Sequence, residues 1–399
     1  MKTSADVIAA LRAGLAPARL SALDLGGADL SALTLTDRHL DAIRLAGADL
    51  GGAALARITL DACDLSGVHG EALRLAEIHA AGLLLSGAHL PRAHLHGVRL
   101  PAASAADAEL RGATLDDVDL TAAVLQGADL ADLVGRGVTL VDADLSRARL
   151  VGARLVGARF TGADLSGADL TRADLSAADL TRADLSAAVV DGLSLRKATL
   201  VAATLAGLDL TRADLGEADL TRADLSGCTL AGLDLRGLRL TDANLAGADL
   251  RATNLAGADL TRANLSAANL AGADLTRARA RFANLAGADL TRADLSEADL
   301  RAAWLGEARL AGARLLHANL ARANLTRADL EGALAGRLRA PYADLSHARL
   351  DRADLRAADL RHASMHRTSE TGARLDGADL RGLRRTDPAR AAAEDFRPG

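Results

Sequence analysis

The sequence predicts an all-β solenoid, because one short pattern recurs every five residues from Leu20 to Leu380. Leucine holds most positions numbered in multiples of five, and alanine holds most positions two residues earlier. The other three positions of the unit are mostly Asp, Asn, Arg, Thr, Ser or Gly. A period of five fits neither the turn of an α-helix nor the two-residue alternation of a flat strand, so the chain must bend once per unit.

The leucine and alanine positions form the expected core of the solenoid. They lie two residues apart, so in an extended segment both side chains point to the same side. Inward-facing residues on this pattern include Leu175, Leu180, Leu225 and Phe160. A single unit buries almost no surface by itself, so each coil must be stabilised by the coils stacked on either side of it.

The stretch AGADLTRANLSAANLAGADL, residues 256–275, resembles the repeat A-(D/N)-L-x-x of the pentapeptide-repeat family. The resemblance implies the fold of that family, a right-handed quadrilateral β-helix with four pentapeptides in each coil. It assigns residues 19–382 to one β-helical domain of about 18 coils.

Four pentapeptides per coil place residues twenty apart on top of one another. Stacked amides can hydrogen-bond along the axis, and stacked charges of alternating sign avoid repulsion. The expected amide column is Asn244, Asn264, Asn284 and Asn324, interrupted by Trp304, and the expected charge column is Asp219, Arg239, Asp259, Arg279 and Asp299.

A short capping helix is expected in residues 1–18, because repeat domains need capped ends. Ser4 is the expected N-cap of this helix. The apolar residues that share one face of it are Val7, Ile8, Leu11 and Leu15.

Residues 383–399 contain the second expected helix, which starts at Asp387-Pro388. In the best-known members of the family the C-terminal end mediates dimerisation. We therefore interpret this segment either as a cap on the last coil or as the seam of a homodimer. In both interpretations Phe396 is the candidate end contact.

The repeat is irregular in residues 331–342 and 361–372, where Ala, Met or Glu replaces some of the leucines. Each stretch is either a loop that leaves the coil or a locally distorted coil. An excursion of five or ten residues preserves the five-residue register, so the sequence leaves both alternatives open.

Composition and motifs argue against catalysis and membrane insertion. The 399 residues carry a net charge of −5, with an acidic excess over residues 101–250 and a basic excess over residues 301–399. No nucleophile, phosphate-loop or Cys-x-x-Cys motif occurs, so we expect no enzymatic activity and no cofactor. The ten histidines fall on different faces of the coil, so no metal site is expected. No uncharged apolar run reaches the length of a membrane span.

The expected compartment is the cytoplasm. Cys63 and Cys228 replace inward alanines and lie several coils apart, too far for a disulfide. Buried free thiols suit a reducing compartment. The first apolar stretch contains Arg12 and is not a convincing signal peptide.

The outward aromatic residues are the candidate partner-binding residues, because exposed Trp, Tyr and Arg are enriched at binding hot spots. The candidates are Phe282, Trp304 and Tyr342, with Arg277, Arg279 and Arg281 close by in the sequence. The alternative is that these rings cover a loop or pack on the surface of the solenoid itself.

Two functions follow from the resemblance and the surface. Several members of the family resemble duplex DNA in width and charge, bind DNA gyrase and protect it from inhibitors. The candidate acidic face for such a role, towards gyrase or topoisomerase IV, is Asp174, Asp184, Asp214 and Asp224, although arginines alternate with these acids. The alternative is an interaction scaffold in a secretion, developmental or stress pathway. Neither function involves direct binding of nucleic acid by this chain.

Overall fold

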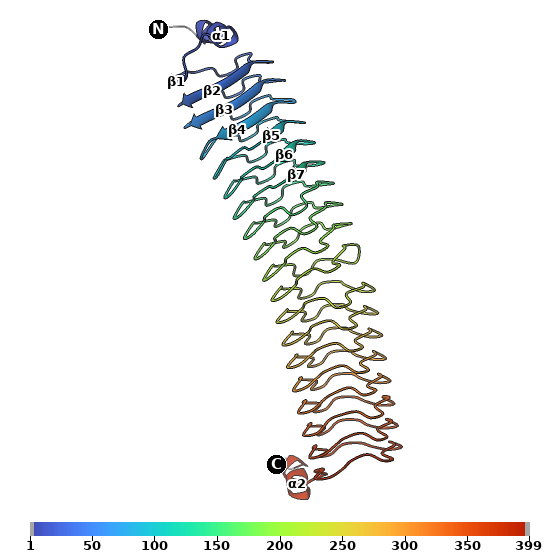
Figure 1. Cartoon of the computed structure of the whole chain (residues 1–399). Helices are drawn as coiled ribbons and strands as arrows, with labels where there is room; N and C mark the ends of the chain where they lie inside the picture. Colours follow the sequence, from blue (N-terminus) through green and yellow to red (C-terminus); the bar gives the residue numbers. More distant parts are fainter. Residues whose placement is uncertain (1–3, 396–399) are drawn as a thin grey trace. The chain divides into compact units, whose positions relative to one another are not determined.

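The computed structural model describes residues 4–395 and divides into two compact units. Unit 1 comprises residues 1–204 and 212–215, and unit 2 comprises residues 205–211 and 216–399. Each unit is a stack of short coils (Figure 1). The elements are α1 (Ser4–Arg12), β1 (Arg19–Ser21), β2 (Thr34–Asp41), β3 (Ala54–Asp61), β4 (Arg74–His79), β5 (His94–His96), β6 (Thr114–Asp116), β7 (Val134–Arg136) and α2 (Pro388–Asp395).

The strands of unit 1 form one seven-stranded parallel sheet in the order β1 to β7. Leu20 pairs with Leu40, and Leu35 pairs with Leu55, so each coil contains twenty residues. Single bridges such as Asp144 to Asp164 continue this register beyond β7, and unit 2 shows the same spacing. The predicted stacking of residues twenty apart is therefore confirmed, with four five-residue segments in each coil.

A tight turn after each leucine explains the five-residue period. In the segment that follows Leu175, Ala177 has a φ of 56° and the N–H of Ala178 donates to the Leu175 carbonyl at 3.1 Å. This is the pattern of a β-turn with its third residue in the left-handed region. The same position holds Gly167 and Arg182, with φ of 65° and 59°. A residue other than glycine there costs roughly 1–2 kcal/mol, which stacking must offset.

The interior is apolar and closely packed at the predicted positions. Leu175, Leu180, Leu225 and Phe160 are each 0% exposed. Cys63 and Cys228 are buried free thiols. Burial raises the pKa of the Cys228 thiol to about 11, so this thiol stays protonated at neutral pH.

Both irregular stretches stay within the coil. In residues 331–342, Leu334 bridges Arg314 and Asp354 in the usual register, and Ala335 is fully buried. In residues 361–372, Ser369 still bridges Arg349, although Glu370 replaces the leucine. Neither stretch is a loop that leaves the coil, so of the two alternatives the distorted coil holds.

Helix α1 packs its apolar side on unit 1. Val7 and Leu11 are buried, as predicted, but Leu15 lies beyond the helix and is 81% exposed, so its assignment to the packed face is wrong. Ser4 lies inside the helix, and its hydroxyl donates to the Asp24 carbonyl at 3.0 Å. This hydrogen bond ties the helix to the first coil, and the N-cap role of Ser4 stays a prediction.

Helix α2 begins as the sequence predicts. The Asp387 carboxylate accepts hydrogen bonds from the backbone N–H groups of Ala389 and Arg390 at 2.9 and 3.1 Å, which is the geometry of an N-cap. No residue of α2 is buried. Phe396, the candidate end contact, lies outside the described residues. Neither helix is long and apolar enough to cross a bilayer, nor is any other helix in residues 4–395.

Candidate interaction surface

Three aromatic side chains project from unit 2 at the positions that the sequence predicts. Phe282, Trp304 and Tyr342 are 61%, 62% and 58% exposed. Phe282 and Tyr342 occupy the left-handed turn position, with φ of 58° and 60°. Many turns carry a residue other than glycine at this position, among them Arg182 and Arg322, so the positive φ is a property of the repeat.

Five stacked turns form what we call the aromatic edge. It consists of Phe282, Ala302, Arg322, Tyr342 and His362. Backbone hydrogen bonds join its turns, as in the bonds from Arg322 to Pro341 and from Tyr342 to Arg361, both 2.9 Å long.

The Tyr342 ring is held between its neighbours on this edge. It stacks on the His362 ring with centroids 4.9 Å apart and an interplanar angle of 12°. The Arg322 guanidinium lies 6.0 Å from the Tyr342 centroid, at the limit of a cation–π contact. Trp304 lies two residues after Ala302 of the edge.

The arginines expected around the aromatic rings are engaged with acids. Arg277 pairs with Glu297 at 2.9 Å, Arg279 with Asp259 at 3.1 Å, and Arg281 with Asp299 at 2.5 Å. Their charges are therefore largely neutralised. The arginines without an acidic partner in the described part of unit 2 include Arg322, Arg337 and Arg339, which the sequence analysis missed. The signal was available, because the residues twenty before and after Arg322 are Ala302 and Tyr342 rather than acids.

The four aspartates of the candidate acidic face do not form one row. Asp174 and Asp214 lie on one ladder with Ser194 between them, whereas Asp184 lies on another ladder and bridges Thr204. Asp224 belongs to unit 2 and accepts a hydrogen bond from the Asn244 amide at 2.9 Å.

The two predicted columns of unit 2 are present. Asn264 donates to the Asn244 side-chain oxygen and Asn284 donates to that of Asn264, both at 3.0 Å, and Trp304 then interrupts the ladder. In the charge column, Arg239 pairs with Asp219 at 3.3 Å. The amide and charged side chains of these columns are therefore paired with one another.

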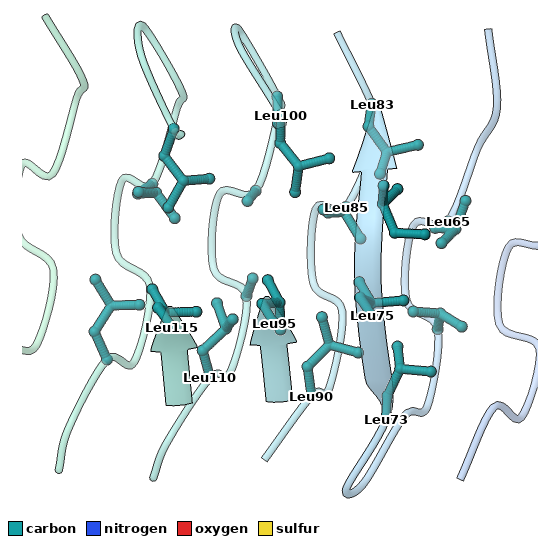
Figure 2. Close-up of a pocket in the computed structure, with 18 of the residues that line it drawn as sticks. Leu65, Leu73, Leu75, Leu83, Leu85, Leu90, Leu95, Leu100, Leu110 and Leu115 are labelled. Atoms are coloured by element: carbon teal, nitrogen blue, oxygen red, sulfur yellow. The ribbon is translucent and has the colours of Figure 1, made fainter. Parts of the chain in front are cut away.

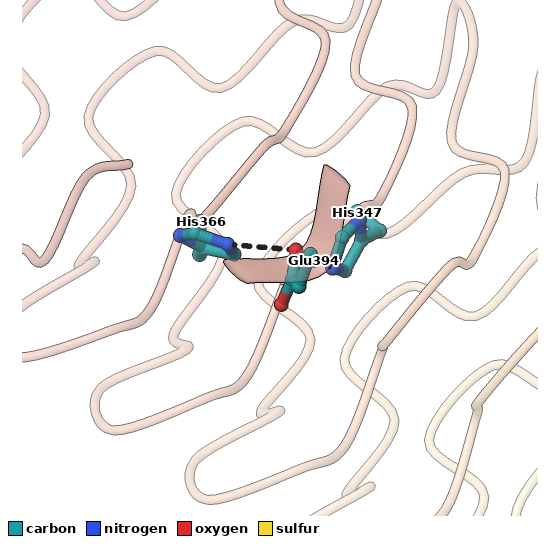
Figure 3. Close-up of side chains that lie close together, drawn as sticks. All are labelled: His347, His366 and Glu394. Carbon is teal, nitrogen blue, oxygen red and sulfur yellow. Dashed lines mark hydrogen bonds and ion pairs between the residues drawn. The ribbon is translucent and has the colours of Figure 1, made fainter. Parts of the chain in front are cut away.

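One cluster in the described part of the chain has the residue types of a metal site: His347, His366 and Glu394 (Figure 3). The Glu394 Oε2 atom lies 3.2 Å from Nε2 of His366 and 3.5 Å from Nε2 of His347. The repeat register predicts the two histidines on different faces. They meet because they occupy adjacent corner positions of consecutive coils, beside α2.

Hydrogen bonding shows that this cluster attaches α2 and is not arranged to bind a metal. The backbone N–H of Asp387 donates to Nδ1 of His366 at 3.2 Å, so the ring proton is on Nε2, which donates to Glu394. A ligating histidine needs the opposite arrangement, with its second nitrogen donating. Arg367 also places its Nε 3.3 Å from the same Glu394 oxygen.

A narrow apolar cavity of about 50 Å³ lies among the interior leucines of unit 1 (Figure 2). Its lining consists only of Leu, Val, Ile and Ala, including Leu75, Leu95, Leu115 and Ala105. Ligand and catalytic sites need a few placed polar groups, and this lining supplies none.

These features define a class of protein: a repeat solenoid with a filled interior and a patterned surface. The family model for pentapeptide repeats matches residues 81–117, 102–134, 115–150, 140–176, 178–216, 218–257, 258–296, 293–332 and 342–382. The chain therefore belongs to the pentapeptide-repeat family. No curated protein matches the chain.

Several solved structures are similar to this chain. HetL, a pentapeptide repeat protein involved in heterocyst differentiation regulation from the cyanobacterium Nostoc, is 34% identical over 61% of this chain and 89% of its own, with a TM-score of 0.20. A pentapeptide repeat protein of the Arabidopsis thaliana thylakoid lumen is 37% identical over 26% and 68%, with a TM-score of 0.21. QnrB1, a plasmid-mediated fluoroquinolone resistance protein, is 19% identical over 53% and 89%, with a TM-score of 0.27.

Proposed function

We propose that this chain is a non-catalytic protein-binding scaffold that docks partners through the aromatic edge and Trp304. The observation that carries the proposal is where its few aromatic residues lie. The chain has only three Phe, one Trp and one Tyr. Phe160 is buried in the core and Phe396 lies outside the described residues, and the other three are all exposed within four consecutive coils of unit 2.

The setting of these rings suits binding. Each ring is attached to backbone that is fixed by hydrogen bonds between coils, Phe282 and Tyr342 at turns and Trp304 at a bridge, so little backbone freedom remains to be lost on association. Tyr342 is further ordered by His362. Tyrosine and tryptophan supply large contact areas with few rotatable bonds, which is why they dominate hot spots.

The proposal includes several finer points about the molecule. We infer a right-handed, four-sided coil of about 18 turns, on the resemblance of the repeat to its family and the twenty-residue register. A cytoplasmic location is supported by the two buried free thiols. Homodimerisation through the C-terminal end is supported only by the resemblance.

Protection of DNA gyrase or topoisomerase IV by mimicry of duplex DNA is the second candidate function. It is favoured by a different row of acids, Asp144, Asp164 and Asp184, which bridge one another on consecutive coils. None of the three forms an ion pair within the described residues. The row is short, since it ends at Thr204, whereas a duplex presents a long series of phosphates. The scaffold is therefore the preferred function.

The test is an affinity capture from lysate of the native host, comparing the wild type with the double variant Phe282→Ala/Trp304→Ala. Leu334→Ala is the matched control, because Leu334 is also an exposed apolar residue of unit 2, at 41%. We expect a partner that the control retains and the double variant loses. If the double variant retains every wild-type partner, the aromatic edge is not the docking surface.

The same capture separates the two candidate functions. Recovery of gyrase or topoisomerase IV subunits, lost on Asp144→Asn/Asp164→Asn/Asp184→Asn but retained by Phe282→Ala/Trp304→Ala, would favour the second candidate.

A further inference from the structure

One face of unit 2 carries a small group of exposed arginines that form no ion pair with any described residue. Most arginines of this unit lie against Asp or Glu, as in the pairs Arg356–Asp354 at 2.6 Å and Arg361–Asp359 at 2.8 Å. Arg322, Arg337 and Arg339 are exposed and form no ion pair with any residue in 4–395. We call these three residues the arginine trio.

The arginine trio is concentrated on two consecutive coils beside Tyr342. Arg339 bridges Asn319 of the preceding coil, and Arg337 lies at the turn two residues before it, with a φ of 56°. Arg322 lies one turn below Tyr342 on the aromatic edge, 6.0 Å from its ring. One face of the coil therefore carries exposed cations at both of its corners. Arg337 lies at one corner, and Arg322 lies with Tyr342 at the other.

A shallow surface hollow of about 360 Å³ lies at the corner that carries Arg337. Its lining includes Leu316, His317 and Gly336 from the adjoining turns. Arg356 also lines the hollow, but Asp354 neutralises it, so Arg337 supplies the uncompensated charge there.

We propose that the arginine trio, with Tyr342, binds an acidic peptide segment of a partner protein, through its Asp or Glu carboxylates. This inference rests on the proposed scaffold function and adds the chemistry of the partner. Guanidinium groups bind carboxylates through paired hydrogen bonds, and a partner that brings opposite charge is selected over a neutral one.

The charges around the trio limit the ligand to a short acidic segment. The ladder that contains Arg339 reads Asp299, Asn319, Arg339, Asp359, so carboxylates lie on both sides of the basic stretch. Nucleic acid binding depends on neutralising many phosphates along a continuous basic track, which these acids interrupt. A short peptide with a few carboxylates can pair with the three arginines of the trio.

Binding is tested with the full chain and a short fluorescein-labelled oligo-glutamate peptide, by fluorescence anisotropy. The variant is Arg337→Glu/Arg339→Glu. Arg292→Glu is the matched control, because Arg292 is exposed, occupies the same left-handed turn position with a φ of 58°, and has no ion pair among the described residues. Circular dichroism establishes that each variant is folded.

We expect the double variant to lower the affinity for the peptide about tenfold or more, and the control to change it about twofold or less. Three results of this binding experiment would overturn the inference: no binding by the wild type, equal losses in variant and control, or tighter binding of labelled single-stranded DNA than of the peptide. A native partner that is lost on Phe282→Ala/Trp304→Ala but kept by Arg337→Glu/Arg339→Glu would overturn it while leaving the scaffold function intact.

Discussion

Helices α1 and α2 each lie against the coil nearest to them, and different forces attach them. Helix α1 buries Val7 and Leu11 against unit 1, and its Arg12 adds one exposed ion pair with Asp29 at 3.4 Å. Helix α2 buries none of its residues, and its contacts with unit 2 are polar, through Glu394 and Asp395. Apolar burial responds little to pH or salt, whereas ion pairs respond to both. The two ends should therefore respond differently to solution conditions.

The largest effect is expected from disrupting the apolar packing of α1 on unit 1. Leu11 is 4% exposed and faces Leu20 and Leu25, so Leu11→Asp places an unpaired charge in their midst. We expect α1 to detach, with a local cost of about 3 kcal/mol or more, measured as lost amide-exchange protection in residues 4–12 and in β1. Leu15→Asp is the control, since Leu15 is exposed. Equal loss of protection in both variants would refute this account of the helix.

A smaller loss of stability is expected from disrupting the polar attachment of α2 to unit 2. Glu394→Ala leaves the buried Nε2–H of His366 without its acceptor and removes an anion beside Arg367. We expect a cost of about 1–3 kcal/mol, seen as faster amide exchange in α2 with α1 unchanged. Asp376→Asn is the control, because its carboxylate is 79% exposed and 4.0 Å from Arg374. Unchanged exchange in α2 would show that other contacts hold the helix.

Acid should loosen α2 selectively. The hydrogen bond from Arg367 lowers the pKa of Asp395 below that of the unfolded chain. A carboxyl group with a lowered folded pKa stabilises the attachment above its unfolded pKa and loses that effect as pH falls through the folded value. We therefore expect α2 to lose NMR-detected order below about pH 4, and α1 to lose less, because Val7 and Leu11 hold it in addition to its Arg12–Asp29 ion pair. Parallel loss at both ends would contradict the distinction.

Added salt should give the smallest difference. The ion pairs that hold α2 include Arg367–Asp395, with Asp395 69% exposed, so about 1 M NaCl screens them within a few ångströms. We expect amide exchange in α2 to rise by a small factor, because exposed ion pairs contribute little to stability. Amide exchange in α1 should stay constant or fall. A larger increase in amide exchange in α1 than in α2 would contradict the view that mainly apolar burial holds α1 and ion pairs hold α2.

The five-residue period predicts the fold well because each position in the unit has a fixed direction. Leucine must point inward wherever the chain turns after it, and Leu175 and Leu225 do so. The twenty-residue register, implied by the family resemblance, also predicts the amide ladder at Asn264. The position of a residue in the repeat sets the direction in which its side chain points, and that position can be read from the sequence.

Contacts between side chains were harder to predict, because they depend on rotamers and on the terminal segments. The register gives no reason for His347 and His366 to share a partner, since that partner, Glu394, comes from α2. Proximity in sequence likewise suggested Arg281 as a partner-binding residue, although it pairs with Asp299. The acids that neutralise an arginine lie mostly about twenty residues away.

The stacking register has a consequence for how such a chain changes length. Removing twenty residues deletes one coil and leaves every later side chain above its former column, so ladders and edges survive. Removing five residues keeps every leucine inward but moves all later outward residues to the next face. A five-residue deletion between Trp304 and Tyr342 would preserve the core while separating Phe282 and Tyr342 onto different corners. Gain or loss of a whole coil therefore leaves the arrangement of the remaining surface residues unchanged. Gain or loss of a single five-residue repeat instead brings different surface residues together on one face.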